Sequence, residues 1–305
     1  MHLQREVLVV GSINVDCTVN VKTLPKAGET IHGTDAVYLP GGKGGNQAVA
    51  VAQANSKVNF ISAVGNDAYA EQALGSLKAF GVDTEGVLRK PVPTGTAFIF
   101  VEESGENLIV VTPGANSLVT PEDVKTQMQK LVPGPNPIVL AQLELPIESV
   151  LEAAAITDSK GGRFVLNLAP AVKIPREMLA VCDPIVVNES EAAFLLGKEI
   201  SNIQEALSSV IELSKLAKSA VITLGADGAV FSEGSGESQG KSEHLSAKKV
   251  TPVDTTGAGD AFLGALTVAL SKNASLKEAV AAGLLAGTEA VLYFGAQPPK
   301  KLVAQ

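Results

Sequence analysis

The sequence predicts an α/β fold with a mostly parallel central sheet, helices on both of its faces, and a small additional β-sheet. Short apolar runs such as Val7–Val10 and Val58–Val64 alternate with segments of helical length along the 305-residue chain. Continuous apolar strands separated by helices are typical of a parallel sheet that is buried on both faces. Residues 14–40 and 94–112 instead show strands with alternating polarity and a hairpin pattern, which predicts the second sheet.

The composition is that of a globular protein with an aliphatic core. Hydrophobic residues make up 46% of the chain, aromatic residues only 4%, and the formal net charge is −8. No cluster of Lys and Arg is present, which argues against a broad nucleic-acid surface. Cys17 and Cys182 are too few for a disulfide framework and suit a reducing cytosol, so we expect a cytoplasmic protein. Glu289 and three glycines interrupt the most apolar stretch, residues 279–296, which predicts a buried helix rather than a membrane span.

The elements follow one another in a regular order. We expect helices at residues 44–55, 68–80, 203–218 and 261–270, and another after the capping box that begins at Ser275. We expect strands at residues 7–10, 58–64, 138–142, 163–168, 185–187 and 221–224, a hairpin at 96–101 and 108–111, and an exposed loop at 233–248.

Two sequence segments are expected to leave the main domain. Residues 1–13, 41–93 and 113–305 form the main α/β domain in this prediction, and residues 14–40 and 94–112 form a small sheet beside it. Such a sheet, attached by two excursions of the chain, suits a lid. The pattern alone hardly separates this lid from an edge extension of the main sheet.

The strongest local motif is Asp-Thr-Thr-Gly-Ala-Gly-Asp at residues 254–260, ahead of an apolar helix. It places Gly257, Ala258 and Gly259 at or before a helix N-terminus, where free N–H groups and the helix dipole attract an anion. Asp260 then lies in the first turn, where a carboxylate is also favoured for stability alone. The functional alternative makes Asp260 a general base beside an anion hole, the pair that phosphoryl transfer needs.

A second glycine-rich motif, Gly-Gly-Lys-Gly-Gly-Asn-Gln at residues 41–47, precedes the first helix. It matches neither the Walker A loop nor the dinucleotide-binding fingerprint. Its glycines allow a ligand to approach the backbone closely, and Lys43 and Asn46 offer hydrogen bonds to hydroxyl groups. A tight strand-to-helix turn is the alternative.

Three further motifs follow apolar strands, at the edge where open α/β sheets bind ligands. Asn14 and Asp16 suit a polyol clamp, or an Asx turn. Asn188 and Glu191 suit Mg²⁺ bound through water, or a solvated helix start. Residues 223–228 form a strand end with a glycine turn, which by itself is only a hairpin signal.

The order of these motifs resembles that of the ribokinase (PfkB-type) family of carbohydrate kinases. The resemblance extends from Val7 to Gln297. Residues 94–96, 105–107, 114–116 and 295–298 also resemble the ribokinase subgroup of that family, which makes D-ribose the first expected substrate. The resemblance implies transfer of a phosphoryl group from ATP to the primary hydroxyl of the sugar, and a lid sheet that often pairs subunits into a homodimer.

The resemblance also implies a role for each motif residue. Asp260 matches the catalytic base, and Gly257, Ala258 and Gly259 match the anion hole. The matching sugar-binding positions are Asn14, Asp16, Gly42, Lys43, Asn46 and Glu144, together with Asp260. The matching nucleotide positions are Asn188, Thr223, Gly225 and Gly228, with Gly257 and Gly259, and Glu191 would bind Mg²⁺ through water.

Ribokinases also bind a potassium-like cation beside the anion hole. Asp254, Thr256, Ala290, Tyr293 and Gly295 match its ligand positions. The sequence departs from the family pattern at Tyr293-Phe294, at Pro299 beside the cation site and at Leu284 near the adenine, and the chain stops soon after residue 298.

Several alternatives remain open from the sequence. One is another kinase of the same family, acting on deoxyribose, a nucleoside or a keto-sugar acid. Another is a nicotinamide-dependent oxidoreductase, although the sequence lacks the glycine fingerprint of that class. A catalytically silent sugar-binding protein is the third alternative. We expect no nucleic-acid or membrane partner.

Overall fold

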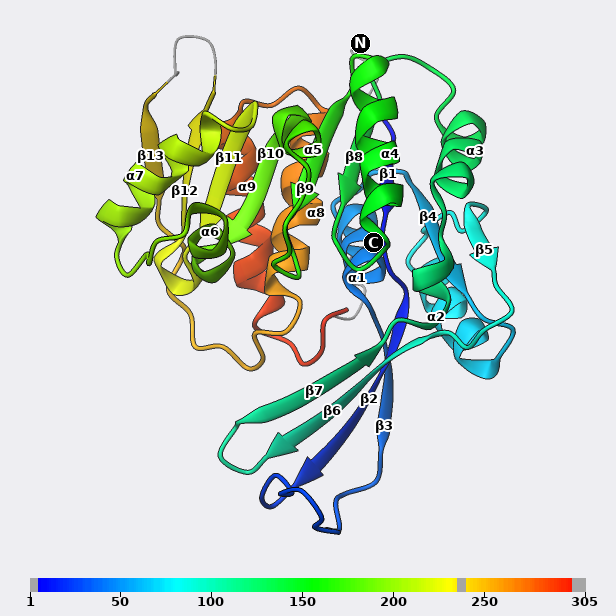
Figure 1. Cartoon of the computed structure of the whole chain (residues 1–305). Coiled ribbons are helices and arrows are strands. Elements are labelled where there is room, and N and C mark those ends of the chain that lie inside the picture. The colour runs from blue at the N-terminus through cyan, green and yellow to red at the C-terminus, as the bar shows by residue number, and fades with distance from the viewer. Residues whose placement is uncertain (1–4, 235–239, 298–305) are drawn as a thin grey trace, which may run out of the picture.

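A computed structural model describes residues 5–234 and 240–297, and within them two sheets carry the fold (Figure 1). The larger sheet has nine strands in the order β13-β12-β11-β10-β9-β8-β1-β4-β5. Its strands β5, β4, β1, β8, β9, β10 and β11 run parallel, and β12 and β13 add an antiparallel edge. The predicted mostly parallel α/β fold is confirmed.

The strands of the larger sheet are short. They are β1 (Val7–Val10), β4 (Val58–Val64), β5 (Val87–Arg89), β8 (Ile138–Ala141), β9 (Arg163–Asn167), β10 (Cys182–Asn188), β11 (Ser219–Thr223), β12 (Ala229–Glu233) and β13 (Ser242–Leu245). Strand β13 corrects the expectation of an exposed loop over 233–248, because Ser242–Leu245 pairs with β12 although three of its four residues are polar. Residues 235–239 of that segment lie outside the described residues.

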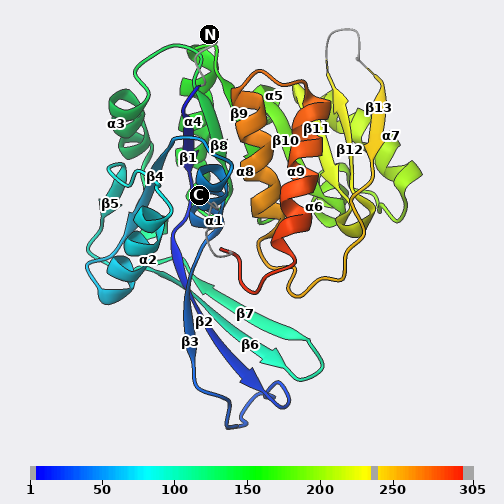
Figure 2. The same cartoon turned by 180° about the vertical axis from the view of Figure 1, so that it is seen from behind.

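Helices cover both faces of this sheet, as the two opposite views show (Figures 1 and 2). One face carries α3 (Pro121–Leu131), α4 (Ile147–Ser159), α5 (Arg176–Val181), α6 (Glu189–Leu196) and α7 (Ile203–Ser214). The other carries α1 (Lys43–Gln53), α2 (Ala68–Ala79), α8 (Ala258–Ser271) and α9 (Leu276–Ala290). Alternate residues of β1 enter opposite cores, Leu8 and Val10 on the first face and Val7 and Val9 on the second.

Two predicted helix ends lie four or more residues beyond the observed ones. Helix α7 ends at Ser214 rather than residue 218, because Ser219 already belongs to β11. Helix α9 ends at Ala290, and residues 291–297 form turns instead of the helix expected through 296. The capping box at its start is confirmed: the Ser275 hydroxyl accepts from the Glu278 N–H, and the Glu278 carboxylate accepts from the Ser275 N–H.

The second sheet has four strands in the order β3-β2-β6-β7 and projects from the carboxyl edge of the larger one (Figure 1). Its strands are β2 (Asn14–Val21), β3 (Val37–Gly41), β6 (Gly95–Glu102) and β7 (Asn107–Thr112). It pairs with no strand of the larger sheet within the described residues, so the edge-extension alternative is wrong. Among those residues, no helix combines the length and the apolar character that a membrane span requires.

Candidate active site

The carboxyl ends of the parallel strands meet at one edge of the larger sheet, where the second sheet also begins (Figure 1). This edge brings together polar residues that are far apart in the sequence. They are Ser12 after β1, Gln142 and Glu144 after β8, Asn167 and Asn188 at the ends of β9 and β10, and Thr223 at the end of β11.

Asp260 lies in the first turn of α8, among the residues that line this edge. Gly257 caps the helix in the left-handed conformation, with φ of 76°, which a residue with a side chain adopts only at a cost. The Asp260 side chain is buried and accepts hydrogen bonds from Asn46 Nδ2 at 3.1 Å and Gln47 Nε2 at 2.9 Å. Burial raises the pKa of Asp260, and the Lys43 charge and these two hydrogen bonds oppose that rise.

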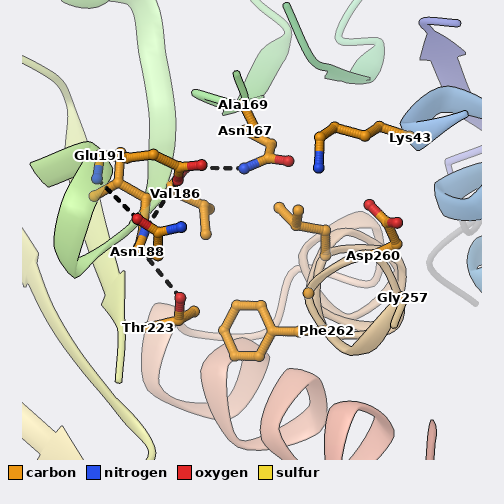
Figure 3. A pocket seen from close by; sticks show the side chains of 13 residues that line it. Lys43, Asn167, Ala169, Val186, Asn188, Glu191, Thr223, Gly257, Asp260 and Phe262 are labelled. Atoms are coloured by element: carbon orange, nitrogen blue, oxygen red, sulfur yellow. Dashed lines mark hydrogen bonds between the residues drawn. The ribbon is translucent and has the colours of Figure 1, made fainter. Parts of the chain in front are cut away.

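A pocket of about 210 Å³ extends from Asp260 along the sheet edge (Figure 3). The Lys43 side chain reaches into it from α1, opposite Asn188 and Thr223 (Figure 3). The pocket thus unites residues from four of the predicted motifs. The predicted site residues that line it are Lys43, Asn188, Glu191, Thr223, Gly257, Gly259 and Asp260.

Asn14 and Asp16 lie within β2, so the alternative of an Asx turn is wrong. Asn14 is buried, and its Oδ1 accepts from Asn116 Nδ2 at 2.9 Å. Asn116 also bonds both main-chain groups of Ile13, which fixes the chain directly before β2. Burial, followed by the nearby charges of Glu144 and Asp260, raises the pKa of Asp16 to about 6. A ligand that donates hydrogen bonds to this carboxyl stabilises its charged form and lowers its pKa again.

Backbone contacts hold the glycine-rich segment at residues 41–45 against β2. Gly42 has φ of 84°, and a Cβ atom there would lie 2.7 Å from the main-chain nitrogen of Asn14. The Glu144 carboxylate accepts from the main-chain N–H of Lys43 at 3.1 Å and from the Ser12 hydroxyl. The predicted sugar-binding residues from three separate segments of the chain therefore share one corner of the site.

Asn188 and Glu191 form a reciprocal capping box at the start of α6. The Glu191 N–H donates to Asn188 Oδ1 at 2.8 Å, and the Asn188 N–H donates to Glu191 Oε2 at 2.9 Å. Burial raises the pKa of Glu191, although the hydrogen bond and the Lys43 charge oppose it. These two residues therefore stabilise the helix start and line the pocket at the same time.

The segment at residues 223–228 connects β11 to the antiparallel β12, as the hairpin signal predicts. The Thr223 hydroxyl donates to the Val187 carbonyl at 3.3 Å. Gly225 and Gly228 both have positive φ and lie at the ends of a 3-10 turn. Thr223 faces the pocket, and Gly225 and Gly228 do not line it.

The predicted cation ligands come from two segments that contact each other. Asp254 accepts hydrogen bonds of 2.9 Å from the N–H groups of Thr256 and Gly295. Partial burial favours a higher pKa for Asp254, but these hydrogen bonds outweigh it and lower the pKa. Ala290 and Tyr293 belong to the same turn, since the Tyr293 N–H donates to the Ala290 carbonyl at 3.2 Å. Pro299, a departure noted in the sequence, lies outside the described residues.

The sequence reasoning missed two buried amides of the site. Gln47 contacts Asp260 and Asn167, and its position directly after Asn46 in the glycine-rich motif could have suggested this. Asn167 lines the pocket at the end of β9, where its polar side chain after three apolar positions was the available signal.

Comparisons with known proteins agree with this arrangement. The family model of pfkB family carbohydrate kinases matches residues 4–302. The chain is 37% identical to a ribokinase of Staphylococcus aureus over 97% of this chain and 96% of the relative. It is 38% identical to a ribokinase of Bacillus subtilis, over 96% and 95% of the two chains.

A solved structure shows the same architecture. The ribokinase of Arabidopsis thaliana, complexed with ribose and ATP, superimposes with a TM-score of 0.86 and 29% identity. The alignment covers 98% of this chain and 97% of the other. The fold, the glycine-capped helix with Asp260 and these similarities together show that the chain belongs to the pfkB family of carbohydrate kinases.

Proposed function

We propose that this protein is an ATP-dependent ribokinase that converts D-ribose to D-ribose 5-phosphate. The observation that carries the proposal is the position of Asp260, a buried carboxylate at a helix N-terminus that opens into the pocket shared with Lys43 and Thr223. The similarity to ribokinases over nearly the full chain supports ribose and ATP as the substrates.

In the proposed reaction, Asp260 accepts the proton of the primary hydroxyl of ribose. The hydroxyl oxygen forms a bond to the γ-phosphorus of ATP while the bond from that phosphorus to the β,γ-bridging oxygen breaks, and ADP leaves. The N–H groups at Gly257, Ala258 and Gly259 would stabilise the negative charge on the transferring group. Asn14, Asp16, Lys43, Asn46 and Glu144, with Gly42 at their backbone contact, would bind the sugar hydroxyls.

Thr223, Gly225, Gly228 and Asn188 are proposed to bind the nucleotide. The residues present also fit Mg²⁺ in its common mode, in which one carboxylate and the substrate phosphates hold a largely hydrated ion. Among the described residues no group of three acidic, His or Cys side chains could hold a metal, but Glu191 supplies one carboxylate at the pocket wall. When bound, Mg²⁺ would neutralise phosphate charge.

A K⁺ ion fits the contact between the segments at residues 254–256 and 290–295. Carboxylate and carbonyl oxygens of Asp254, Thr256, Ala290, Tyr293 and Gly295 would supply its ligands. The hydrogen bond between Asp254 and Gly295 already joins the two segments. The ion would stabilise the shape of the adjoining anion hole without touching substrate.

The four-stranded sheet, residues 14–40 and 94–112, is proposed to act as a lid on the main domain and as the contact of a homodimer. Its strands β3, β6 and β7 expose a group of large apolar side chains, which single soluble domains rarely leave uncovered. These are Val37, Tyr38, Phe98, Leu108, Ile109, Val110 and Val111. We propose a cytoplasmic location.

The decisive experiment measures ribose-dependent release of ADP with and without K⁺. We expect ribose to give the highest kcat/KM in a panel with deoxyribose, nucleosides and keto-sugar acids. Asp260→Asn should lower kcat by about 10²–10⁴-fold, since this is the contribution of general-base catalysis, while ribose binding stays close to that of the wild type. An Asn variant with the wild-type rate would overturn the role of Asp260, and absence of turnover on every sugar would favour a silent binding protein.

A further inference from the structure

Both oxygens of the Asp260 carboxylate are held by side-chain amides of α1. Asn46 Nδ2 donates to Oδ2 at 3.1 Å, and Gln47 Nε2 donates to Oδ1 at 2.9 Å. Each carboxylate oxygen can accept two hydrogen bonds, so each keeps one lone pair for a substrate hydroxyl. The two amides therefore orient the carboxylate without blocking it.

A second pair of amides holds the first pair. Gln142 Nε2 donates to Gln47 Oε1 at 2.6 Å, and Gln297 Nε2 donates to Asn46 Oδ1 at 3.0 Å. Asp260 thus receives two parallel chains of hydrogen bonds, each with an outer glutamine, an inner amide and one carboxylate oxygen. We call these four amides, Asn46, Gln47, Gln142 and Gln297, the amide clamp.

We propose that Gln142 and Gln297 are positioning residues that fix Asn46 and Gln47 as hydrogen-bond donors to Asp260. This inference rests on the proposed role of Asp260 as the general base. Neither outer glutamine contacts the carboxylate itself, and both act through the inner amides.

The physical reason is that a side-chain amide has two ends of similar shape and opposite polarity. If Asn46 or Gln47 turned over, it would direct an oxygen at the carboxylate, and two acceptors would then face each other. A donor from Gln142 or Gln297 at the far end stabilises only the orientation that keeps the N–H groups on Asp260. Linked amides of this kind also polarise one another, which strengthens both bonds.

The geometry of Gln142 shows that its donor end is the one in use. Its side chain is fully buried, and its Oε1 has no hydrogen-bond partner within the described residues. A Cβ atom on Gly11 would lie 1.9 Å from this oxygen, so the backbone of Gly11 packs directly against it. An unpartnered buried oxygen costs free energy, which the bond from Nε2 to Gln47 has to offset.

Gln297 comes from the segment that also contacts the anion-hole loop. Gly295 in that segment donates to Asp254, and a Cβ atom on Gly257 would lie 2.7 Å from Ala296 Cα. Gln297 then contacts Asn46, and its Oε1 accepts from Ser76 at 3.3 Å. The segment at residues 295–297 therefore makes two contacts. It completes the amide clamp through Gln297, and it packs against the start of α8 through Ala296.

Three charged groups also affect the ionisation of Asp260. The test must distinguish the effect of the amide clamp from the effect of these charges. Lys43 on α1 favours its charged form, and Glu144 disfavours it. Asp16 on β2 is coupled to it as well. A neutral substitution in the clamp leaves these three charges unchanged, so leucine replaces glutamine in the test.

The test measures the pH dependence of kcat and of kcat/KM for Gln142→Leu, Gln297→Leu and the double variant. Loss of the outer donors should raise the pKa of Asp260. We expect the acidic limb of the kcat/KM profile to move to higher pH by about one unit. At a pH below the limb, kcat/KM should fall roughly tenfold, and at high pH it should return to the wild-type value. The KM for ribose should change less for Gln142→Leu, whose partner is Gln47, than for Gln297→Leu, whose partner Asn46 is itself a proposed sugar-binding residue.

The matched control is Gln127→Leu on α3, which also has a buried side-chain oxygen without a partner among the described residues. It should keep the wild-type pH profile. If Gln142→Leu does not fold, the half-buried Gln297 still decides the question. An unchanged acidic limb in the Leu variants, or an equal loss at every pH, would overturn the clamp. Wild-type protein without ribose turnover, or a fully active Asp260→Asn, would instead overturn the proposed function.

Discussion

The carboxylate of Asp254 accepts a 2.9 Å hydrogen bond from the main-chain N–H of Gly295, across a sequence separation of 41 residues. The other oxygen of the same carboxylate accepts from the Thr256 N–H. One side chain therefore joins the loop ahead of α8 to the segment after α9, and both segments border the helix start that carries Asp260.

Asp254→Ala should separate these two segments. Hydrogen bonds to a charged group contribute about 1.5–3 kcal/mol, and partial exposure places this loss at the lower end, so we expect a fall of about 1–2 kcal/mol in the free energy of unfolding. The K⁺ concentration for half-maximal activity should rise. Denaturant unfolding and a K⁺ titration of activity measure the two effects. Asp254→Asn is the control, because its side chain keeps one oxygen that can accept a hydrogen bond. An unchanged K⁺ titration in Asp254→Ala would contradict the cation site.

Asp16→Asn should stabilise the protein at pH 8 while weakening ribose binding. The folded state raises the pKa of Asp16 from 3.8 to about 6, so the folded protein holds this proton more tightly than the unfolded chain. Its contribution to stability is full below about pH 4 and is lost as the pH rises through about 6. The difference corresponds to at most about 3 kcal/mol at pH 8. The neutral amide avoids this loss but accepts fewer hydrogen bonds from sugar hydroxyls.

Thermal unfolding at pH 4.5 and pH 8, with ribose binding by calorimetry, checks this prediction. The stability gain of Asp16→Asn should be present at pH 8 and small at pH 4.5. The exposed Asp35→Asn in the same segment serves as the control and should show neither change. An Asp16→Asn variant that is less stable than wild type at pH 8 would refute the burial argument.

The sequence predicted the buried parts of the fold well because their signals are local. Val58–Val64 has the predicted bounds, since a β-branched apolar run between turns leaves little choice. Strand β13 was missed because Leu245 is the only apolar residue of Ser242–Leu245, and its pairing with β12 depends on the rest of the sheet.

In the site, residues at glycine-rich turns were predictable because the turn itself marks them. Gln47 and Asn167 carry weaker local signals, a place at the end of the glycine-rich motif and a polar residue at a strand end, which do not identify their partners. Their contacts span 213 and 120 residues of sequence, so the contact partners are not contained in any local pattern. The outer amide Gln297 depends on a contact across 251 residues.

Glu191→Gln should separate the helix-capping role of this residue from its proposed role toward Mg²⁺. Glutamine keeps an oxygen that can accept from the Asn188 N–H, so the capping box and the melting temperature should change little. The negative charge at the pocket wall is lost, and the Mg²⁺ concentration for half-maximal activity should rise several-fold. A Mg²⁺ titration at fixed ATP measures this.

Asn188→Ala provides the opposite variant. It removes the side chain that accepts from the Glu191 N–H and should cost about 0.5–2 kcal/mol of stability. The Mg²⁺ titrations of the two variants are then compared after correction for the fraction of folded protein. If the correction removes the shift of Glu191→Gln as well as that of Asn188→Ala, Glu191 acts only as a helix cap.

The two faces of the four-stranded sheet make different predictions for the homodimer. Strand pairing places Ile109 and Val111 of β7 on the same face as Asp16, whereas Val110 lies on the opposite face with Phe98 and Tyr38. Tyr38 already stacks on Tyr69 of α2, with ring centroids 5.7 Å apart, so part of that second face is covered within the chain.

The face with Asp16 is therefore the better candidate for contact with a second copy. Ile109 is 53% exposed, and covering the face that it shares with Asp16 would also exclude water from the sugar. Ile109→Glu should convert a dimer into monomers of 31.3 kDa and raise the KM for ribose, since a buried unpaired charge is costly. Val110 is about as exposed as Ile109 but lies on the other face, so the Val110→Glu variant should remain dimeric. Sedimentation equilibrium measures both masses, and a wild-type monomer, or dissociation caused only by Val110→Glu, would show that this face does not pair the subunits.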